Sequence, residues 1–195
     1  MRTRSVPVLL ALAFAVALVS PLAGARAAAE PSISYIYPSS GFCGTLITIN
    51  GNGFGSSRGD SYVSFGTSKA TDYTLWRSYQ IRVNVPAGCY WTRDVKVTTL
   101  GGGSNARSFK VKPKITGVSP TSGKIGSCVE VTGNGFGSHR GAGSVYFEHH
   151  IAATSATSWT NSRLVAKIPS MSTGKTCVTV YTNGGTGNSY PFTVK

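Results

Sequence analysis

The feature that most constrains the fold of this chain is an internal repeat. Residues 38–65 (PSSGFCGTLITINGNGFGSSRGDSYVSF) align without a gap with residues 120–147 (PTSGKIGSCVEVTGNGFGSHRGAGSVYF), and 14 of these 28 positions are identical. The offset is 82, and one residue added in the second copy raises it to 83 for the rest of the repeat. Such self-similarity indicates duplication of a structural unit. The sequence therefore predicts a first domain at 31–111 and a second at 112–195, which abut near VKPK.

Each copy has the pattern of a β-protein. In the first copy, alternating apolar runs such as TLITING and QIRVNVP are separated by turns rich in Gly and Pro, and no helical period is sustained outside the N-terminus. About seven short antiparallel strands in one domain are typical of an immunoglobulin-like sandwich. We therefore expect an all-β fold of two tandem immunoglobulin-like β-sandwich domains. The expected core of the first domain is Ile47, Ile49, Val63, Phe65, Ile81, Val83, Val95 and Val97.

Several motifs recur in the same order in both copies. They are P-x-S-G, G-N-G-F-G, V-x-F, a tryptophan (Trp76 and Trp159), a run ending in V-P or I-P, V-x-V, G-G and a closing F-x-V. In this order they resemble the IPT/TIG domain, an immunoglobulin-like module of surface receptors, Rel-type transcription factors and many secreted bacterial proteins. The resemblance implies binding or spacing rather than any one ligand.

The N-terminus predicts export. Arg2 and Arg4 precede an apolar run through Leu22, and small residues at A-x-A spacing follow. This pattern is typical of a secretory signal peptide at 1–27, with cleavage after Ala27 and Ala29 as the alternative. No later run of 18 apolar residues occurs, so no membrane span is expected. We expect a secreted protein, extracellular or periplasmic.

Four cysteines, two in each copy, favour two disulfides in an exported chain. The simplest pairing lies within the repeats, Cys43 with Cys89 and Cys128 with Cys177. The cysteines are not equivalent between copies: Cys43 and Cys89 precede their strands, whereas Cys128 and Cys177 lie in or at the start of theirs. Redox and zinc roles are not favoured, because C-x-x-C and zinc-ligand spacing are absent from the sequence.

Charge is sparse and basic. Residues 30–111 carry a net charge of +4 and residues 112–195 a net charge of +6. A cationic exported protein attracts anionic polymers such as acidic glycans, wall polymers, lipid head groups or nucleic acid. The alternative is that the scattered charges serve solubility alone. Nucleic acid is not the favoured partner, because export argues against a nuclear role.

The sequence favours a protein that is not an enzyme and needs no cofactor. It has no G-x-S-x-G, phosphate loop or H-E-x-x-H motif. The acids show no pairing typical of a glycosidase, although sequence spacing alone does not exclude one. EHH at 148–150 fits either a partial metal site or a polar turn, and the turn is preferred. No metal site is therefore expected.

The candidate ligand-binding residues are aromatic and basic side chains. Tyr90 and Trp91 lie beside Arg93 in a loop where the second copy has SMSTGKTC, and such rings stack on sugars or aromatic ligands. The alternative is that Trp91 caps its own core or covers a bridge at Cys89. Trp76 and Trp159 recur, and we interpret them as scaffold.

The tripeptide Arg58-Gly59-Asp60 spells an integrin-recognition motif, but the second copy has Arg140-Gly141-Ala142. The shared part predicts an inter-strand turn with glycines at positive φ, so integrin binding is not favoured. Arg58 and Arg140, kept in both copies, join the candidate ligand-binding residues. Taken with the loop aromatics, the sequence predicts a non-enzymatic binding or adhesion protein that engages polysaccharide or another envelope polymer. The alternative is a structural or assembly protein with a protein partner.

Overall fold

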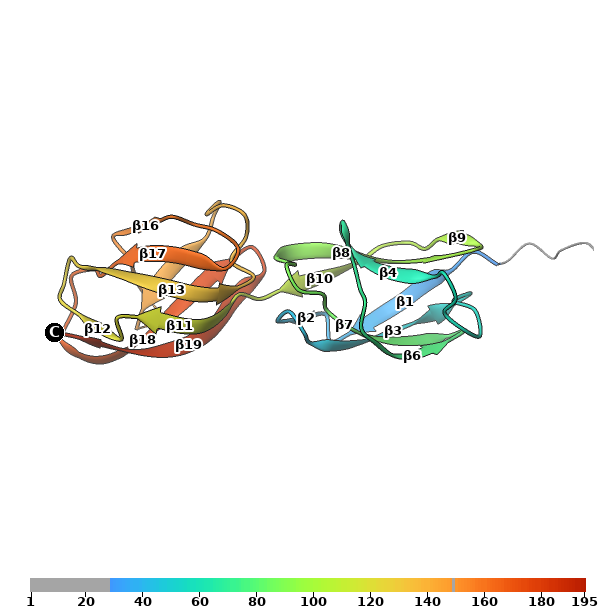
Figure 1. The fold of residues 1–195 in the computed structure, drawn as a ribbon, viewed down its shortest axis with the longest axis horizontal. Helices are drawn as coiled ribbons and strands as arrows, with labels where there is room; N and C mark the ends of the chain where they lie inside the picture. The colour runs from blue at the N-terminus through green and yellow to red at the C-terminus, as the bar shows by residue number, and fades with distance from the viewer. Residues whose placement is uncertain (1–28, 149) are drawn as a thin grey trace, which may run out of the picture.

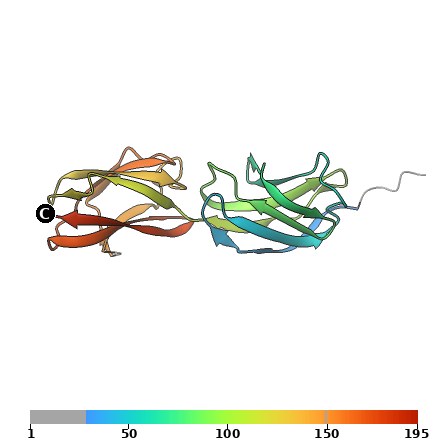
Figure 2. The ribbon, with the colours of Figure 1, turned by 60° about the horizontal axis from the view of Figure 1, so that its bottom comes forward.

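A computed structural model describes residues 29–148 and 150–195 of the chain. Two β-sandwiches lie end to end along the long axis of the molecule (Figures 1 and 2). Every regular element in the described part of the chain is a β-strand. The all-β prediction is therefore confirmed, while the predicted signal peptide at 1–27 lies outside the described residues.

Domain 1 packs two sheets face to face. The first has the strand order β1-β3-β7-β6, and the second has the order β2-β10-β8-β4-β5 with β9 paired to β8. The strands are β1 (Ser32–Tyr37), β2 (Ser40–Gly41), β3 (Leu46–Asn52), β4 (Tyr62–Phe65), β5 (Ser68–Lys69), β6 (Tyr73–Arg77), β7 (Gln80–Asn84), β8 (Trp91–Thr99), β9 (Gly102–Gly103) and β10 (Arg107–Val111).

Domain 2 repeats this arrangement. Its sheets have the orders β11-β13-β17-β16 and β12-β19-β18-β14-β15. The strands are β11 (Lys114–Ser119), β12 (Ser122–Gly123), β13 (Cys128–Asn134), β14 (Ser144–Phe147), β15 (Ile151–Ala152), β16 (Ser155–Thr157), β17 (Arg163–Lys167), β18 (Gly174–Thr182) and β19 (Gly185–Val194).

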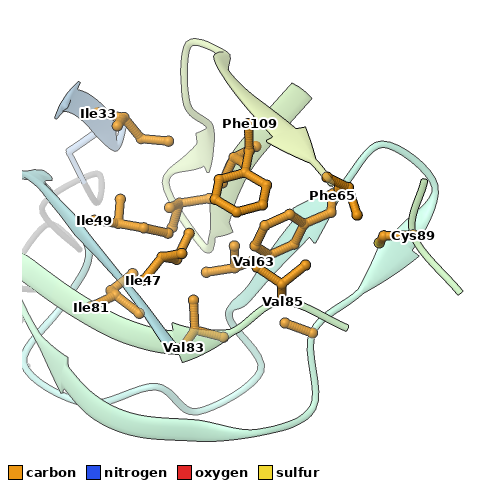
Figure 3. Packing of buried hydrophobic residues seen from close by; sticks show 14 of the residues in the cluster. Ile33, Ile47, Ile49, Val63, Phe65, Ile81, Val83, Val85, Cys89 and Phe109 are labelled. Carbon is orange, nitrogen blue, oxygen red and sulfur yellow. The ribbon is translucent and has the colours of Figure 1, made fainter. Parts of the chain in front are cut away.

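The alternating residues of the strands fill each sandwich. All eight residues predicted for the core of domain 1 are at most 1% exposed. Phe65 and Phe109 meet edge to face at its centre, with ring centroids 5.9 Å apart (Figure 3). Phe147 and Phe192 form the corresponding pair in domain 2. The predicted core is therefore confirmed.

The G-N-G-F-G segment anchors the same end of each sandwich. Its phenylalanine, Phe54 or Phe136, is fully buried. The indole N–H of Trp76 donates a 2.9 Å hydrogen bond to the Phe54 carbonyl, and Trp159 donates a 2.9 Å bond to the Phe136 carbonyl. The two tryptophans are thus scaffold, as predicted. Later in the same loops, Gly59 and Gly141 have φ values of 49° and 50°, which confirms the predicted turn conformation.

Candidate functional site

The aromatic loop predicted to bind a ligand lies at the junction of the two domains. Trp91 begins β8, and its ring meets His139 of domain 2 edge to face at a centroid distance of 4.9 Å. Trp91 also lies over Gly137, where an added Cβ would come within 2.4 Å of its indole nitrogen. Glycine at 137 therefore makes room for the tryptophan, and Trp91 covers the neighbouring domain rather than its own core.

Hydrogen bonds from side chains to backbone carbonyls also connect the two domains at this junction, which we call the joint. Nδ2 of Asn161 donates to the Gly88 carbonyl at 3.4 Å, and the Thr92 hydroxyl donates to the Asn183 carbonyl at 3.5 Å. Together with Trp91, these contacts hold the loop 88–92 of domain 1 against the end of domain 2.

Tyr90 and Arg93 belong to the joint as well. The Tyr90 ring packs edge to face on Trp91 at 5.1 Å, and the Arg93 guanidinium lies 4.2 Å from the centre of the Tyr90 ring. Hydrogen bonds with Ser138 and then with Arg93 lower the pKa of Tyr90. The predicted aromatic residues thus pack together at the joint between the domains, and their role in ligand binding stays a prediction.

Arg58 and Arg140 occupy equivalent loops but have different partners. The Arg58 guanidinium lies 5.1 Å from the centre of the Tyr73 ring, whereas Nε of Arg140 donates to the Gly143 carbonyl at 3.0 Å. Burial raises the pKa of Tyr73, against the opposing effects of its hydrogen bond to the Val63 N–H and the Arg58 charge. Arg58 thus packs against strand β6, Arg140 bonds within its own loop, and ligand binding by either stays a prediction.

A second group of residues, not singled out from the sequence, forms an exposed face on the first sheet of domain 1. Tyr35 and Tyr37 of β1 are 58% and 73% exposed. Tyr35 is paired with Asn50 of β3, and Asn50 is paired with Gln80 of β7. Residues directly opposite each other in antiparallel strands share a face of the sheet. These three residues therefore form one row on the outside of the sandwich.

A parallel row runs beside the first. Tyr37 is paired with Thr48, and Thr48 is paired with Arg82. Within the first row, Nε2 of Gln80 donates to Oδ1 of Asn50 at 3.0 Å. We call these six residues the tyrosine face. It offers two exposed rings beside amide, hydroxyl and guanidinium groups on one flat surface.

The same face of domain 2 has a different chemistry. Gly117 and Ser119 stand where domain 1 has Tyr35 and Tyr37, as their pairing with Thr132 and Glu130 shows. An ion pair of 2.5 Å joins Arg163 to Glu130 across the strands there. The aromatic surface is thus a property of domain 1, and domain 2 supplies an internal control.

A β-bulge explains why sequence patterning missed the tyrosine face. Strict alternation along SISYIYP would put Ile33, Tyr35 and Tyr37 on one face, so the pattern alone does not separate the tyrosines from the core. The pairing of β1 with β3 shifts register between Ile33 and Tyr35. Ile36 then packs against the core and both tyrosines face outward. The signal that could have revealed this is the second copy, where Val118 matches Ile36 while Gly117 and Ser119 match the tyrosines.

Cys43, Cys89 and Cys128 carry free thiols in this structure. Cys43 donates its S–H to the Cys89 carbonyl at 3.2 Å, and burial raises the pKa of both thiols. The nearby Cys89 raises the pKa of Cys43 further. Cys128 and Cys177 lie in opposite sheets of domain 2. Both disulfides stay predictions.

Across the described residues, no group of three or more His, Cys, Asp or Glu side chains is placed to hold a metal ion. Likewise, the same residues include no helix of the length and hydropathy needed to cross a membrane.

The two pairs of packed sheets define a pair of immunoglobulin-like β-sandwich modules. The IPT/TIG domain profile matches residues 31–111 and 113–194, so the chain belongs to the IPT/TIG domain family. This agrees with the family resemblance deduced from the repeated motifs.

Comparison with known proteins finds two kinds of relative. A cyclomaltodextrin glucanotransferase of Niallia circulans is 40% identical over 78 residues, which are 39% of this chain and 11% of the enzyme. One of Paenibacillus macerans is 34% identical over 96 residues, 47% of this chain and 13% of the enzyme. This chain thus matches only about a tenth of each enzyme's length. Among solved structures, the surface glycan-binding protein PbSGBP-B of Prevotella bryantii has a TM-score of 0.52 at 18% identity, covering 84% of this chain and 42% of that one.

Proposed function

We propose that this chain is a non-catalytic carbohydrate-binding protein that works outside the cell or at its surface, and that the tyrosine face is its contact with the glycan. Support comes first from the relatives. The cyclomaltodextrin glucanotransferases are by name enzymes of glucans, and the part they share with this chain is about the length of one sandwich domain. The structurally similar protein of Prevotella bryantii is named as a surface glycan-binding protein.

The observation that carries the proposal is the pair of exposed rings, Tyr35 and Tyr37, on one face of a rigid sheet. Residues two apart in a strand lie roughly 7 Å apart, so the two rings present successive apolar surfaces along β1. Aromatic rings contribute large contact areas with few rotatable bonds, which suits stacking against the apolar faces of sugar rings.

The polar members of the face complement these rings. Asn50 and Gln80 each have donors and acceptors for sugar hydroxyls, and Arg82 adds guanidinium donors. The ionisable groups of this face, apart from the tyrosine hydroxyls, are Arg82 in the second row and Arg77 of β6, which is paired with Gln80 at the end of the first row. Rings, amides and hydroxyls outnumber the two arginines on this face, and we infer that the ligand is a neutral glucan chain that follows both tyrosine rings along β1, with β3 and β7 beside it.

Replacing both tyrosines tests this proposal. In native gels that contain soluble α-glucans, β-glucans or xyloglucan, we expect the unmodified chain to be retarded by at least one polysaccharide. Tyr35→Ala/Tyr37→Ala should raise Kd at least about tenfold, equivalent to about 1.4 kcal/mol. Both side chains are exposed, so the stability of the variant should change by less than about 0.5 kcal/mol per site.

The matched control is Tyr181→Ala, because Tyr181 is a 42% exposed tyrosine in β18 of domain 2. It should bind glucan as the unmodified chain does. The proposal fails if no polysaccharide retards the chain, or if the double variant and the control bind equally.

A further inference from the structure

A hollow of about 450 Å³ lies at the end of domain 1 away from domain 2. Its walls are the glycine-rich loop 53–61, Ser78, the turn 99–101 and Ala29. We call it the tip cavity. Its volume lies within the ~300–1,000 Å³ typical of ligand pockets. Arg58, Gly59 and Asp60 are part of its wall, so the tripeptide belongs to a concave surface.

The repeat relates this cavity to the joint. Gly55, Ser57 and Leu100 of the wall correspond to Gly137, His139 and Asn183. In domain 2 those three residues receive the loop of domain 1: Trp91 lies over Gly137 and against His139, and Thr92 donates to Asn183. The cavity is therefore the counterpart, in domain 1, of a surface that holds a tryptophan in domain 2.

The backbone frameworks of the two surfaces agree in detail. Phe54 N–H donates to the Ser78 carbonyl at 3.1 Å, and Phe136 N–H donates to the Asn161 carbonyl at 3.2 Å. Gly101 N–H donates to the Thr99 hydroxyl at 3.1 Å, and Gly184 N–H donates to the Thr182 hydroxyl at 3.1 Å. The same scaffold thus builds both surfaces.

The side chains around the tip cavity make it more open, and more apolar at its rim, than the corresponding surface of domain 2 at the joint. Ser57 replaces the imidazole of His139, and Leu100, which is 93% exposed, replaces Asn183. At Gly55 an added Cβ would meet nothing closer than the Ser57 carbonyl at 3.4 Å, so the space that Trp91 fills over Gly137 is open here. A 93% exposed leucine beside an open hollow marks an interaction surface. The corresponding surface of domain 2 holds an aromatic ring, Trp91.

From this correspondence we propose that the tip cavity docks an aromatic side chain carried on a loop of a partner protein, in the way the joint docks Trp91. A second copy of this chain does not provide that loop at its free end, because Thr173 and Gly174 stand where domain 1 has Tyr90 and Trp91. Tyr90 and Trp91 themselves are engaged in the joint. The occupant is thus a different polypeptide that carries an exposed tryptophan on a loop.

A peptide copy of the joint loop tests the proposal. The probe is PAGSYWTRD, residues 86–94 with serine for Cys89, and the control peptide PAGSYSTRD lacks the tryptophan. Each is titrated into the intact two-domain chain while backbone amide NMR signals are followed. We expect the tryptophan peptide to shift the amides of residues 53–61 and 99–101 at millimolar concentration, with at least fivefold smaller shifts from the control peptide.

A matched pair of variants completes the experiment. Leu100→Arg should reduce the peptide-induced shifts at least fivefold, whereas Ile125→Arg, at an exposed apolar residue of domain 2, should leave them unchanged. The proposal is overturned if the two peptides act alike, if neither moves these signals, or if Leu100→Arg has no effect. A soluble glucan that shifts the cavity amides would also overturn it, because the cavity would then be a sugar site. If glucan shifts only the amide signals of β1, β3 and β7, the result supports glucan binding by the tyrosine face and leaves the proposal for the tip cavity standing.

Discussion

At the scale of single residues, the two domains share their scaffold and differ in what they expose. Phe54 and Phe136 are fully buried in both, whereas Tyr35 has glycine as its counterpart in domain 2. Trp91 is a further difference, since it has φ of 59°, a left-handed conformation unusual for a bulky residue. The contact of its ring with His139 and Gly137 accounts for a side chain that its own sandwich core does not need.

Removing the Trp91 ring should loosen the joint while leaving both sandwiches folded. Aromatic pairs contribute about 0.5–1.5 kcal/mol beyond the area they bury, and Trp91 meets both Tyr90 and His139. For Trp91→Ala we expect NMR relaxation to give separate rotational correlation times for the two domains, in place of one shared value.

Tyr79→Ala is the control, since Tyr79 is 53% exposed in domain 1 and lies outside the joint. It should leave the shared tumbling intact. Unchanged tumbling in Trp91→Ala would mean that the ring does not hold the domains together. Because we assign glucan binding to the tyrosine face, Trp91→Ala should bind glucan within about twofold of the unmodified chain, which is about 0.4 kcal/mol.

At the scale of strands and loops, most of the fold could be predicted from alternation, turn residues and the repeat. The seven main strands of domain 1 fall where alternating runs occur, because a two-sheet core requires apolar residues at every second position. Two features required three-dimensional information. The bulge in β1 reverses which residues face solvent, and the meeting of loop 88–92 with Gly137 depends on how two separate sandwiches are placed. The site was therefore less predictable than the fold.

The pair Glu130 and Arg163, on neighbouring strands β13 and β17, gives an element-level prediction. The hydrogen bond and charge of Arg163 lower the pKa of Glu130. A carboxyl group whose pKa is lower in the folded state stabilises the fold above its unfolded pKa, about 4.3 for glutamate, and loses that effect as pH falls through the folded value. Both side chains are exposed, so the stabilisation should be small.

NMR titration of the Glu130 carboxyl checks this prediction. The pKa of Glu130 should lie below the usual glutamate range in the unmodified chain and return to it in Arg163→Ala. Arg77→Ala, at the edge of the corresponding sheet in domain 1, should leave the titration unchanged. Equal Glu130 titrations in the unmodified chain and Arg163→Ala would show that the pair does not form in solution.

At the scale of the whole molecule, the two sandwiches lie in line, so the first sheet of domain 1 runs along the side of the molecule (Figure 1). The walls of the tip cavity come from other parts of domain 1, the loop 53–61 and the turn 99–101. The joint uses the loop 88–92, and the tyrosine face lies on β1, β3 and β7. The glycan contact and the protein contact that we propose thus use different surfaces of domain 1, and both of these surfaces lie outside the joint.

The measurement that tests carbohydrate binding most directly is a titration of the intact chain with a soluble glucan, followed through its backbone amide NMR signals. We predict that the largest shifts fall in residues 35–37, 48–50 and 80–82, and that residues 117–119 and 130–132 of the matching face in domain 2 do not move. The absence of shifts with every glucan, or shifts centred on the joint, the tip cavity or domain 2, would contradict binding by the tyrosine face.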